Sequence, residues 1–312
     1  MIKKPRVLVV GSINKDIIFS GPHMDSCIKN IPAVYESYSS ANGGKGANQA
    51  AVAALLGADV YMAGCVGDDE NGREQIKFFH ELGICTDYIK VFSEVQTGFA
   101  SILLMDDGTY LSSNVLGANN FLTPDLVKRV LEEQTFDMVL MQMEMPLETV
   151  YCTYEYASRY NTPVIFDPGP AKDVCLDRLK HIFMISPNEA ETYAFTGIRV
   201  IDEESAYQAA DLLYRRCEPE HIMLKLGSMG AYYYNGERGK LYPPFQVECR
   251  DTTGAGDTFT AELMIKLCEK VSIDTAVHYA NAAGAICVSR QGGQPSIPSK
   301  EEVEQFLLSR ER

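Results

Sequence analysis

The stretch DTTGAGDTF at residues 251–259 places three small residues, Gly254, Ala255 and Gly256, directly before the carboxylate of Asp257. Backbone N–H groups that open a helix bind anions, and such donors stabilise the spread negative charge of a transferring phosphoryl group. An attacking hydroxyl must also lose its proton, and a carboxylate at the helix start is a suitable general base. Asp257 can instead simply cap the helix and complement its dipole. Because capping does not explain the small residues in front of it, the stretch predicts an anion hole followed by a base.

Polar residues also follow two predicted strands. Asn14 and Asp16 come just after the apolar run at 7–10, and Glu144 follows the run MVLMQM. Asn and Asp favour capping turns in any protein. In open α/β sheets, however, ligands bind beyond the carboxyl ends of the strands. The repeated placement at strand ends therefore favours a binding site.

The motif PNEAE at 187–191 follows another apolar run and places Asn188 and Glu191 one helical turn apart. The pair can form a capping box at a helix start. It can also orient a hydrated Mg²⁺, an ion that prefers oxygen ligands and keeps its waters. The residues alone leave both interpretations open.

A glycine-rich turn, NGGKGAN at 42–48, leads into an alanine-rich run. Glycines permit close approach of the backbone, and Lys45 and Asn48 can donate hydrogen bonds to hydroxyl groups or phosphate. Other glycine-rich signatures are absent: the sequence has no GxxxxGK[ST], no GxGxxG after the first strand, and no HExxH. A P-loop protein, a dinucleotide-binding domain and a zinc protease are therefore not indicated.

Apolar, β-branched runs alternate with longer helical patterns, which is typical of a mostly parallel sheet covered by helices. The runs predict strands at 7–10, 60–63, 138–142, 164–166, 183–185 and 222–226, an antiparallel partner at 231–234, and helices at 47–56, 74–82, 205–216, 258–268 and 275–288. Two segments lack a helical pattern, the polar stretch 16–42 and the run TGFASILLMDDGTYL, which contains an Asp-Gly turn. They predict a small β-sheet lid, formed by segments of about 14–42 and 97–113, over the strand ends. No linker or repeat divides the chain, so we expect one domain over residues 1–312.

The 312 residues are 46% hydrophobic and carry a net charge of −14. Nucleic acid is not an expected partner, because phosphate binding needs clustered Lys and Arg. No apolar run is long enough to span a bilayer, and the first one is too short for a signal peptide. The nine cysteines are scattered singly, without a CxxC pair, as is typical of a reducing compartment. We therefore expect a cytoplasmic protein without a membrane partner.

Seven motifs resemble those of the ribokinase-like PfkB carbohydrate kinases, in family order and over essentially the whole chain. They are GSINKD at 11–16, NGGKGANQA at 42–50, LMQMEMPLE at 140–148, PNEAE at 187–191, KLGSMG at 225–230, DTTGAGDTF at 251–259 and SRQGGQPSIP at 289–298. The resemblance implies a ribokinase-like α/β fold, with a central mostly parallel sheet flanked by helices and a small β-sheet lid. It also implies ATP-dependent phosphorylation of a sugar's terminal hydroxymethyl group, giving D-ribose 5-phosphate if the sugar is ribose.

The resemblance also implies roles for individual residues. Asp257 would be the base, with Gly254, Ala255 and Gly256 as the anion hole. The sugar hydroxyls would be held by Asn14, Asp16, Gly44, Lys45, Asn48, Glu144 and Asp257. ATP would lie along Asn188, Lys225, Gly227, Ser228, Gly230, Gly256 and Asn281, with Glu191 organising Mg²⁺. An activating monovalent cation, expected to be K⁺, would lie beside the anion hole at Asp251, Thr253, Cys287, Arg290, Gly292 and Ser296, several of them acting through backbone carbonyls.

Three positions depart from the family pattern. Tyr35 stands where a Pro-x-x-Gly-Glu turn of the lid has glycine, which bears on sugar choice and on a homodimer formed through the lid. Glu262 stands where small residues are usual, and Asn281 stands where a histidine often lines the adenine. Ribose is the expected sugar because Asn14, Asp16 and GGKGAN are retained. The alternatives are a kinase for another sugar, such as deoxyribose or fructose, and a catalytically inactive sugar-binding regulator, against which the intact Asp257 speaks.

Overall fold

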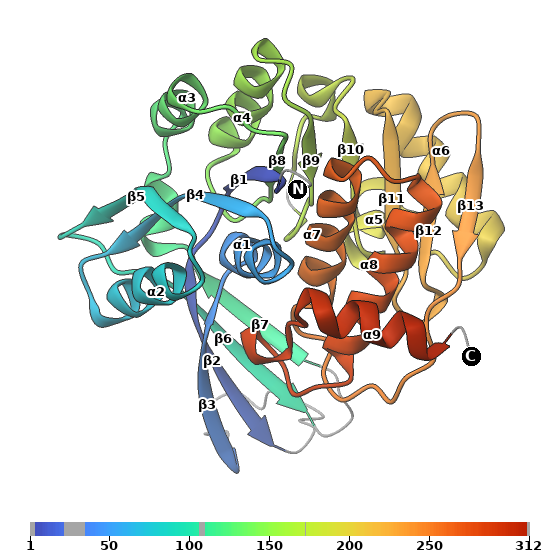
Figure 1. The fold of residues 1–312 in the computed structure, drawn as a ribbon. Coiled ribbons are helices and arrows are strands. Elements are labelled where there is room, and N and C mark those ends of the chain that lie inside the picture. Colours follow the sequence, from blue (N-terminus) through green and yellow to red (C-terminus); the bar gives the residue numbers. More distant parts are fainter. Residues whose placement is uncertain (1–3, 22–34, 106–109, 172, 311–312) are drawn as a thin grey trace.

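Two β-sheets organise the molecule (Figure 1). The computed structural model describes residues 4–21, 35–105, 110–171 and 173–310. Within these ranges one sheet has nine strands and the other has four. None of the helices described is both long and apolar enough to cross a membrane.

The nine-stranded sheet runs in the order β13-β12-β11-β10-β9-β8-β1-β4-β5. Neighbouring strands are parallel from β11 to β5, whereas β12 and β13 pair antiparallel at one edge. The strands are β1 (Arg6–Val10), β4 (Asp59–Gly67), β5 (Cys85–Phe92), β8 (Met138–Met141), β9 (Val164–Phe166), β10 (Met184–Ile185), β11 (His221–Lys225), β12 (Ala231–Tyr234) and β13 (Gly239–Tyr242). Because the parallel strands share one direction, their carboxyl ends meet along one edge, where ligands bind in such sheets.

Helices cover both faces of this sheet (Figure 1). Val7 and Val9 of β1 face one core and Leu8 and Val10 face the other, because successive side chains of a strand alternate between faces. The first core is covered by α1 (Lys45–Leu55), α2 (Glu70–Glu81), α7 (Ala255–Cys268), α8 (Ile273–Val288) and α9 (Lys300–Arg310); the second by α3 (Pro124–Glu133), α4 (Leu147–Arg159), α5 (Glu189–Thr196) and α6 (Glu203–Cys217). Short 3₁₀ turns are η1 (Gly117–Phe121), η2 (Leu176–Leu179), η3 (Gly227–Met229) and η4 (Gln294–Ser296).

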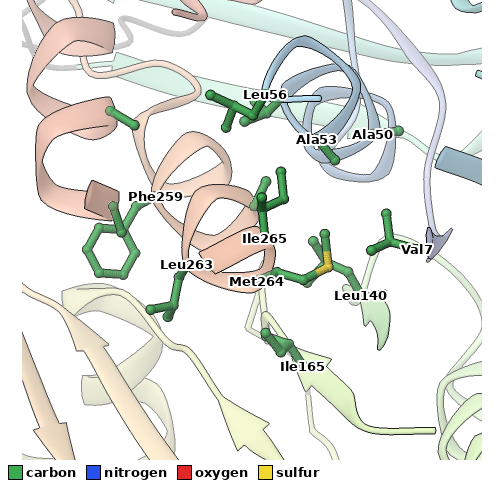
Figure 2. Close-up of a cluster of buried hydrophobic side chains, with 14 of the residues drawn as sticks. Val7, Ala50, Ala53, Leu56, Leu140, Ile165, Phe259, Leu263, Met264 and Ile265 are labelled. Atoms are coloured by element: carbon green, nitrogen blue, oxygen red, sulfur yellow. The ribbon is translucent and has the colours of Figure 1, made fainter. Parts of the chain in front are cut away.

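Helix α7 is buried on all sides over most of its length. Figure 2 shows Leu263, Met264 and Ile265 of this helix among apolar side chains of the sheet and of α1. The partners labelled there are Val7, Ala50, Ala53, Leu56, Leu140 and Ile165. The small side chains of Ala50 and Ala53 allow α1 to pack closely against α7. The core therefore holds the first turn of α7 in position.

The four-stranded sheet forms the lid and runs in the order β3-β2-β6-β7. Its strands are β2 (Asn14–Gly21), β3 (Ser37–Gly43), β6 (Gly98–Met105) and β7 (Tyr110–Val115). They come from the two segments that lack a helical pattern, and β6 pairs antiparallel with β7 as the sequence predicts. The predicted Asp-Gly turn and most of the atypical lid turn before Tyr35 lie outside the described residues.

The predicted fold class is confirmed: a mostly parallel central sheet lies between helices, with a separate small β-sheet. Each strand and helix that the sequence predicts overlaps an observed element of the same type. The prediction that β12 runs antiparallel to β11 is confirmed as well. Of α5 the sequence predicted only the start, through the capping box of Asn188 and Glu191. It missed β5, β13, α3, α4 and α9. Strands β5 and β13 lie at the two edges of the sheet, half exposed and without a continuous apolar run.

We expect Leu140→Ala to lower the free energy of unfolding by about 2–5 kcal/mol, because it leaves a cavity beneath α7. Leu140 is 0% exposed. Chemical denaturation of both proteins measures the difference. Leu308→Ala is the control, because Leu308 is 63% exposed and its loss should change the unfolding free energy little. Equal effects of the two substitutions would contradict the core described here.

Candidate active site

Helix α7 begins at the carboxyl edge of the central sheet with an open N-terminus. Gly254 is its N-cap and has a left-handed backbone with φ of 81°, a conformation that favours glycine. No side chain caps this helix start. Backbone donors at such a start attract an anion, so the geometry fits the predicted anion hole.

The carboxylate of Asp257 turns away from its own helix and binds side chains of α1. Asn48 Nδ2 donates to Asp257 Oδ2 at 3.1 Å, and Gln49 Nε2 donates to Oδ1 at 2.9 Å. Lys45 Nζ lies 3.5 Å from Oδ1. Helix capping is therefore not the role of this side chain. The structure brings the predicted base together with two predicted sugar ligands, Lys45 and Asn48.

Asp167 is a central residue of this site that the sequence reading missed. It follows β9 directly and is 0% exposed. Its carboxylate lies 2.8 Å from Lys225 Nζ and 3.6 Å from Lys45 Nζ. Burial raises the pKa of this carboxyl, but Lys225 and then Lys45 outweigh burial and hold the pKa below its usual value. The rule that found the other polar residues at strand ends also applies to Asp167.

Lys45 remains charged in this environment. Burial lowers the pKa of its ammonium group, but Asp167 and Asp257, followed by Glu191 and Glu144, raise the pKa well above its usual value. A permanent positive charge beside the base suits the binding of a phosphoryl group or of hydroxyl oxygens.

The residues predicted to bind the sugar lie where the lid joins the central sheet. Glu144 accepts hydrogen bonds from the hydroxyl of Ser12 and from the backbone N–H of Lys45, the latter at 3.0 Å. Asn114 of β7 donates to Glu144 at 3.4 Å. Asn14 accepts from Asn119 Nδ2 at 2.8 Å. Ser12, Asn114 and Asn119 were missed by the sequence reading, because only the folded chain brings them to this place.

Two predicted sugar ligands hold buried oxygens that lack a partner among the described residues. They are Asp16 Oδ1 and Asn48 Oδ1. Burial, then Glu144 and Asp257, raises the pKa of Asp16 to about 7. Gly44 turns the chain between lid and α1 with a φ of 90°. Unpartnered buried acceptors are rare in folded proteins, so these two oxygens are well placed to accept hydroxyl groups.

Two of the residues predicted to bind ATP and Mg²⁺, Asn188 and Glu191, form the predicted capping box at the start of α5. Asn188 N–H donates to Glu191 Oε2 and Glu191 N–H donates to Asn188 Oδ1, both at 2.8 Å. The other oxygen of Glu191 lies against Gly169, close to Lys45. Burial, followed by repulsion from Asp167, raises the pKa of Glu191. The pair thus caps α5 while one carboxylate oxygen still faces the site.

Lys225 lies between the other residues predicted to bind ATP and the predicted anion hole at Gly254–Gly256. Its Nζ donates to Thr260 Oγ1 at 3.2 Å as well as binding Asp167. A Cβ placed on Gly256 would lie 3.7 Å from this Nζ. The predicted ATP residues Gly227 and Ser228 form η3, which Gly230 ends. Asn281 of α8 donates to the carbonyl of Pro243 at 3.2 Å and lines a cavity of about 570 Å³.

The residues predicted to hold a monovalent cation are gathered into one loop cluster. Asp251 accepts the backbone N–H groups of Thr253 at 2.8 Å and Gly292 at 3.0 Å. Cys287 Sγ lies 3.1 Å from Ser296 Oγ and 3.8 Å from the carbonyl of Thr253. The side chain of Arg290 instead pairs with Glu302, which leaves only its backbone for the cluster. Among the described residues there is no group of three or more His, Cys, Asp or Glu side chains that could hold a metal ion, so a cation here would depend on backbone and hydroxyl oxygens.

The site combines an open helix N-terminus, a buried carboxylate and two lysines, of which Lys225 is buried and Lys45 is partly exposed. These are the parts that a phosphotransferase needs. A family model described as pfkB family carbohydrate kinase matches residues 4–300. The chain therefore belongs to the pfkB family of carbohydrate kinases.

Curated relatives and solved structures agree with this assignment. The chain is 36% identical over 301 residues to a ribokinase of Haemophilus influenzae, covering 96% of this chain and 97% of that protein. It is 34% identical over 302 residues to a ribokinase of Bacillus subtilis, covering 96% and 99%. The structure of Arabidopsis thaliana ribokinase complexed with ribose and ATP is similar with a TM-score of 0.85 at 29% identity, covering 98% of this chain and 99% of that one.

Glu262 lies inside α7, one and a half turns beyond the base, and is almost fully buried. Lys266 Nζ lies 3.9 Å from its carboxylate, and its Oε2 has no hydrogen-bond partner within the described chain. Burial outweighs Lys266 and raises the pKa of Glu262 from 4.5 to about 7. Lys266 is closer to Glu269, at 2.9 Å, so it offsets the burial of Glu262 only in part.

This burial predicts a pH-dependent stability that Glu262→Gln removes. Between pH 4.5 and about 7 the unfolded chain releases the Glu262 proton while the folded chain keeps it, so the wild-type free energy of unfolding falls as pH rises. Above this window both states are ionised and the difference between the two proteins becomes constant. Denaturant unfolding of both proteins at several pH values measures this difference in the free energy of unfolding. The exposed Glu301→Gln should follow the wild type; a Glu262→Gln profile parallel to the wild type would contradict the assignment.

Proposed function

We propose that this carbohydrate kinase transfers the terminal phosphoryl group of ATP to the terminal hydroxymethyl group of D-ribose, giving D-ribose 5-phosphate. Ribokinases of two bacteria are its relatives over nearly their whole length, and a similar plant structure is a complex with ribose and ATP. The observation that carries the proposal is the carboxylate of Asp257, held by α1 at the open start of α7.

The base and the anion hole act on different oxygens. Asp257 takes the proton of the attacking hydroxyl, while the backbone N–H groups of Gly254–Gly256 receive the charge of the transferring phosphoryl group. Lys45 and Lys225 add positive charge on the two sides of this path. The carboxylate of Asp257 and the ammonium group of Lys225 are held by hydrogen bonds before any ligand arrives, so these two groups need little reorganisation during the reaction.

The sugar would lie between the lid and the central sheet. Its hydroxyl groups would bind Asn14, Asp16, Asn48 and Glu144, with the backbone of Gly44 close by. The unpartnered oxygens of Asp16 and Asn48 support this placement, because sugar hydroxyls would satisfy them.

ATP would lie along the turn at 225–230, with Asn188 near the phosphates and Asn281 towards the adenine. Mg²⁺ would be organised by the free oxygen of Glu191, and it would neutralise charge between the phosphates. K⁺ would be held in the loop cluster of Asp251, Thr253, Cys287, Gly292 and Ser296, with Arg290 contributing its backbone. There it would fix the shape of the loop that leads into the anion hole.

Two alternatives remain for the sugar and one for the activity. A deoxyribokinase of Salmonella typhi is 29% identical over 303 residues, which makes deoxyribose the first alternative sugar, with fructose as the second. A catalytically inactive sugar-binding regulator is disfavoured by the hydrogen-bonded Asp257 and the uncapped start of α7.

A phosphorylation screen across pentoses and hexoses tests the proposal. Ribose should show the highest kcat/KM with ATP. Asp257→Asn should lower kcat by about 10²–10⁴-fold, because the general base is lost, while calorimetry should still detect sugar binding. A higher kcat/KM for deoxyribose or fructose would replace ribose as the substrate. Wild-type turnover by the variant would remove Asp257 from the role of base.

We expect K⁺ to raise kcat/KM relative to Na⁺ at equal ionic strength, because a bound K⁺ would stabilise the loop before the anion hole. Steady-state assays in the two salts measure this ratio. Asp251→Ala should abolish the difference, since Asp251 holds the N–H groups of Thr253 and Gly292. Glu302→Gln, which removes the negative charge that pairs with the Arg290 side chain and leaves Asp251 in place, should keep the difference. An equal response to both salts in the wild type would refute the cation site.

The lid is also proposed as the contact of a homodimer. Strands β3 and β7 are the edges of the lid sheet, and an open edge strand can pair with a second chain. Tyr38 of β3 and Val115 of β7 are strongly exposed apolar side chains. Covering them in a dimer would remove apolar surface from water.

A further inference from the structure

Gln49 lies between the two buried carboxylates of the site. It is 0% exposed, and its Nε2 donates to Asp257 Oδ1 and to Asp167 Oδ2, both at 2.9 Å. A side-chain amide has two N–H donors, so both are used. Gln49 comes from the second turn of α1, one residue beyond Asn48, and no sequence motif considered above assigns it a role.

The orientation of the Gln49 amide is determined by its surroundings. Both carboxylates accept hydrogen bonds when they are ionised, so the NH₂ group must face them. The Oε1 atom of Gln49 accepts from Gln142 Nε2 at the end of β8. Two donors and one acceptor are thus satisfied inside the core, which leaves a single arrangement of the amide.

We infer that Gln49 is a positioning residue that orients the general base. Its hydrogen bond occupies Asp257 Oδ1. Oδ2 accepts a hydrogen bond from Asn48 and keeps a second acceptor position for the substrate hydroxyl. The inference rests on the proposed function, because it assigns Asp257 the role of base. During the reaction the hydroxyl proton moves to Asp257 Oδ2; Gln49 neither gains nor loses a proton.

A neutral donor is well suited to this place. Two carboxylates held close together repel each other, which favours protonation of one of them. Gln49 stabilises both ionised groups without adding charge, whereas a lysine in its position would compete with Lys45 for them. The charged and titratable groups around Asp257 are Lys45 of α1, Asp16 of β2, Cys287 of α8, Glu144 after β8, Asp167 after β9 and Lys225 of β11. Lys45 and Lys225 thus already supply positive charge to the two carboxylates.

Gln49→Met tests the role, because methionine is similar in length and flexible but cannot donate a hydrogen bond. A hydrogen bond to an ionised group favours the ionised form, so its loss should move the acidic limb of the kcat–pH profile to higher pH. We expect kcat at the wild-type optimum to fall by about 10- to 100-fold, in line with hydrogen bonds to charged groups. The KM for the sugar should change little, because Gln49 does not face the open side of the site.

Gln49→Glu keeps the shape and replaces the donor by a third acid. The acidic limb should then move further than in Gln49→Met, because like-charge repulsion adds to the lost hydrogen bond. We expect the midpoint pH of the acidic limb to rise from the wild type to Gln49→Met and to rise again in Gln49→Glu. If Gln49→Met does not fold, the comparison of wild type and Gln49→Glu carries the same test.

Thr153→Val is the matched control for the loss of a buried hydrogen bond. Thr153 lies in α4, where its hydroxyl donates to the carbonyl of Thr149, and its replacement should lower the Tm without moving the pH profile. A purely structural role of Gln49 predicts the same behaviour. The inference is therefore refuted if the Gln49 variants lose kcat with an unmoved acidic limb, or if they turn over like the wild type. All profiles use the sugar with the highest kcat/KM in the screen, so failure of ribose would reject that sugar and leave this test intact.

Discussion

The charge balance around Asp167 is the constraint on which the active site depends. This carboxylate is fully buried, and burying an unpaired charge is costly. Lys45 of α1 and Lys225 of β11 offset that cost from two different elements. Removing either lysine would leave buried negative charge uncompensated, so the pair ties α1 to the carboxyl edge of the sheet. Asp257 then shares Lys45 with Asp167, and the base is held by the same balance.

Helix α7 explains how an acid can stand directly behind an anion site. The proposed anion hole consists of backbone donors at the start of the helix, whereas the Asp257 side chain leaves the helix sideways towards α1. The backbone donors and the Asp257 carboxylate therefore point in different directions and can contact different atoms of two reacting groups. This arrangement requires α7 to be held firmly against α1, and the apolar contacts of Leu263, Met264 and Ile265 do so (Figure 2).

The sequence predicted most of the central sheet because its strands, buried on both faces, are short apolar runs. Edge strands such as β5 lack such a run and were missed. The strand-end rule found Asn14, Glu144 and Asn188, but Asp167 stands before Pro168, and an Asp-Pro pair is equally typical of a turn. Gln49 lies inside the motif at 42–50, but nothing in its local sequence predicts its partners. Its partners lie 118 and 208 residues away along the chain, and only the folded protein brings them together.

On the lid side of the site, the protonation of Asp16 depends on a second balance between burial and neighbouring charges, which a bound sugar would change. Asp16 is buried near Glu144 and Asp257, and burial together with these two acids raises its pKa to about 7. Hydroxyl groups donating to Asp16 would favour its ionised form and lower this pKa. By linkage, a sugar that binds the ionised carboxylate must bind more tightly as pH rises through this range. If Asp16 binds the sugar as proposed, its charged form is poorly stabilised until the sugar arrives, so part of the sugar's binding free energy would go into ionising Asp16.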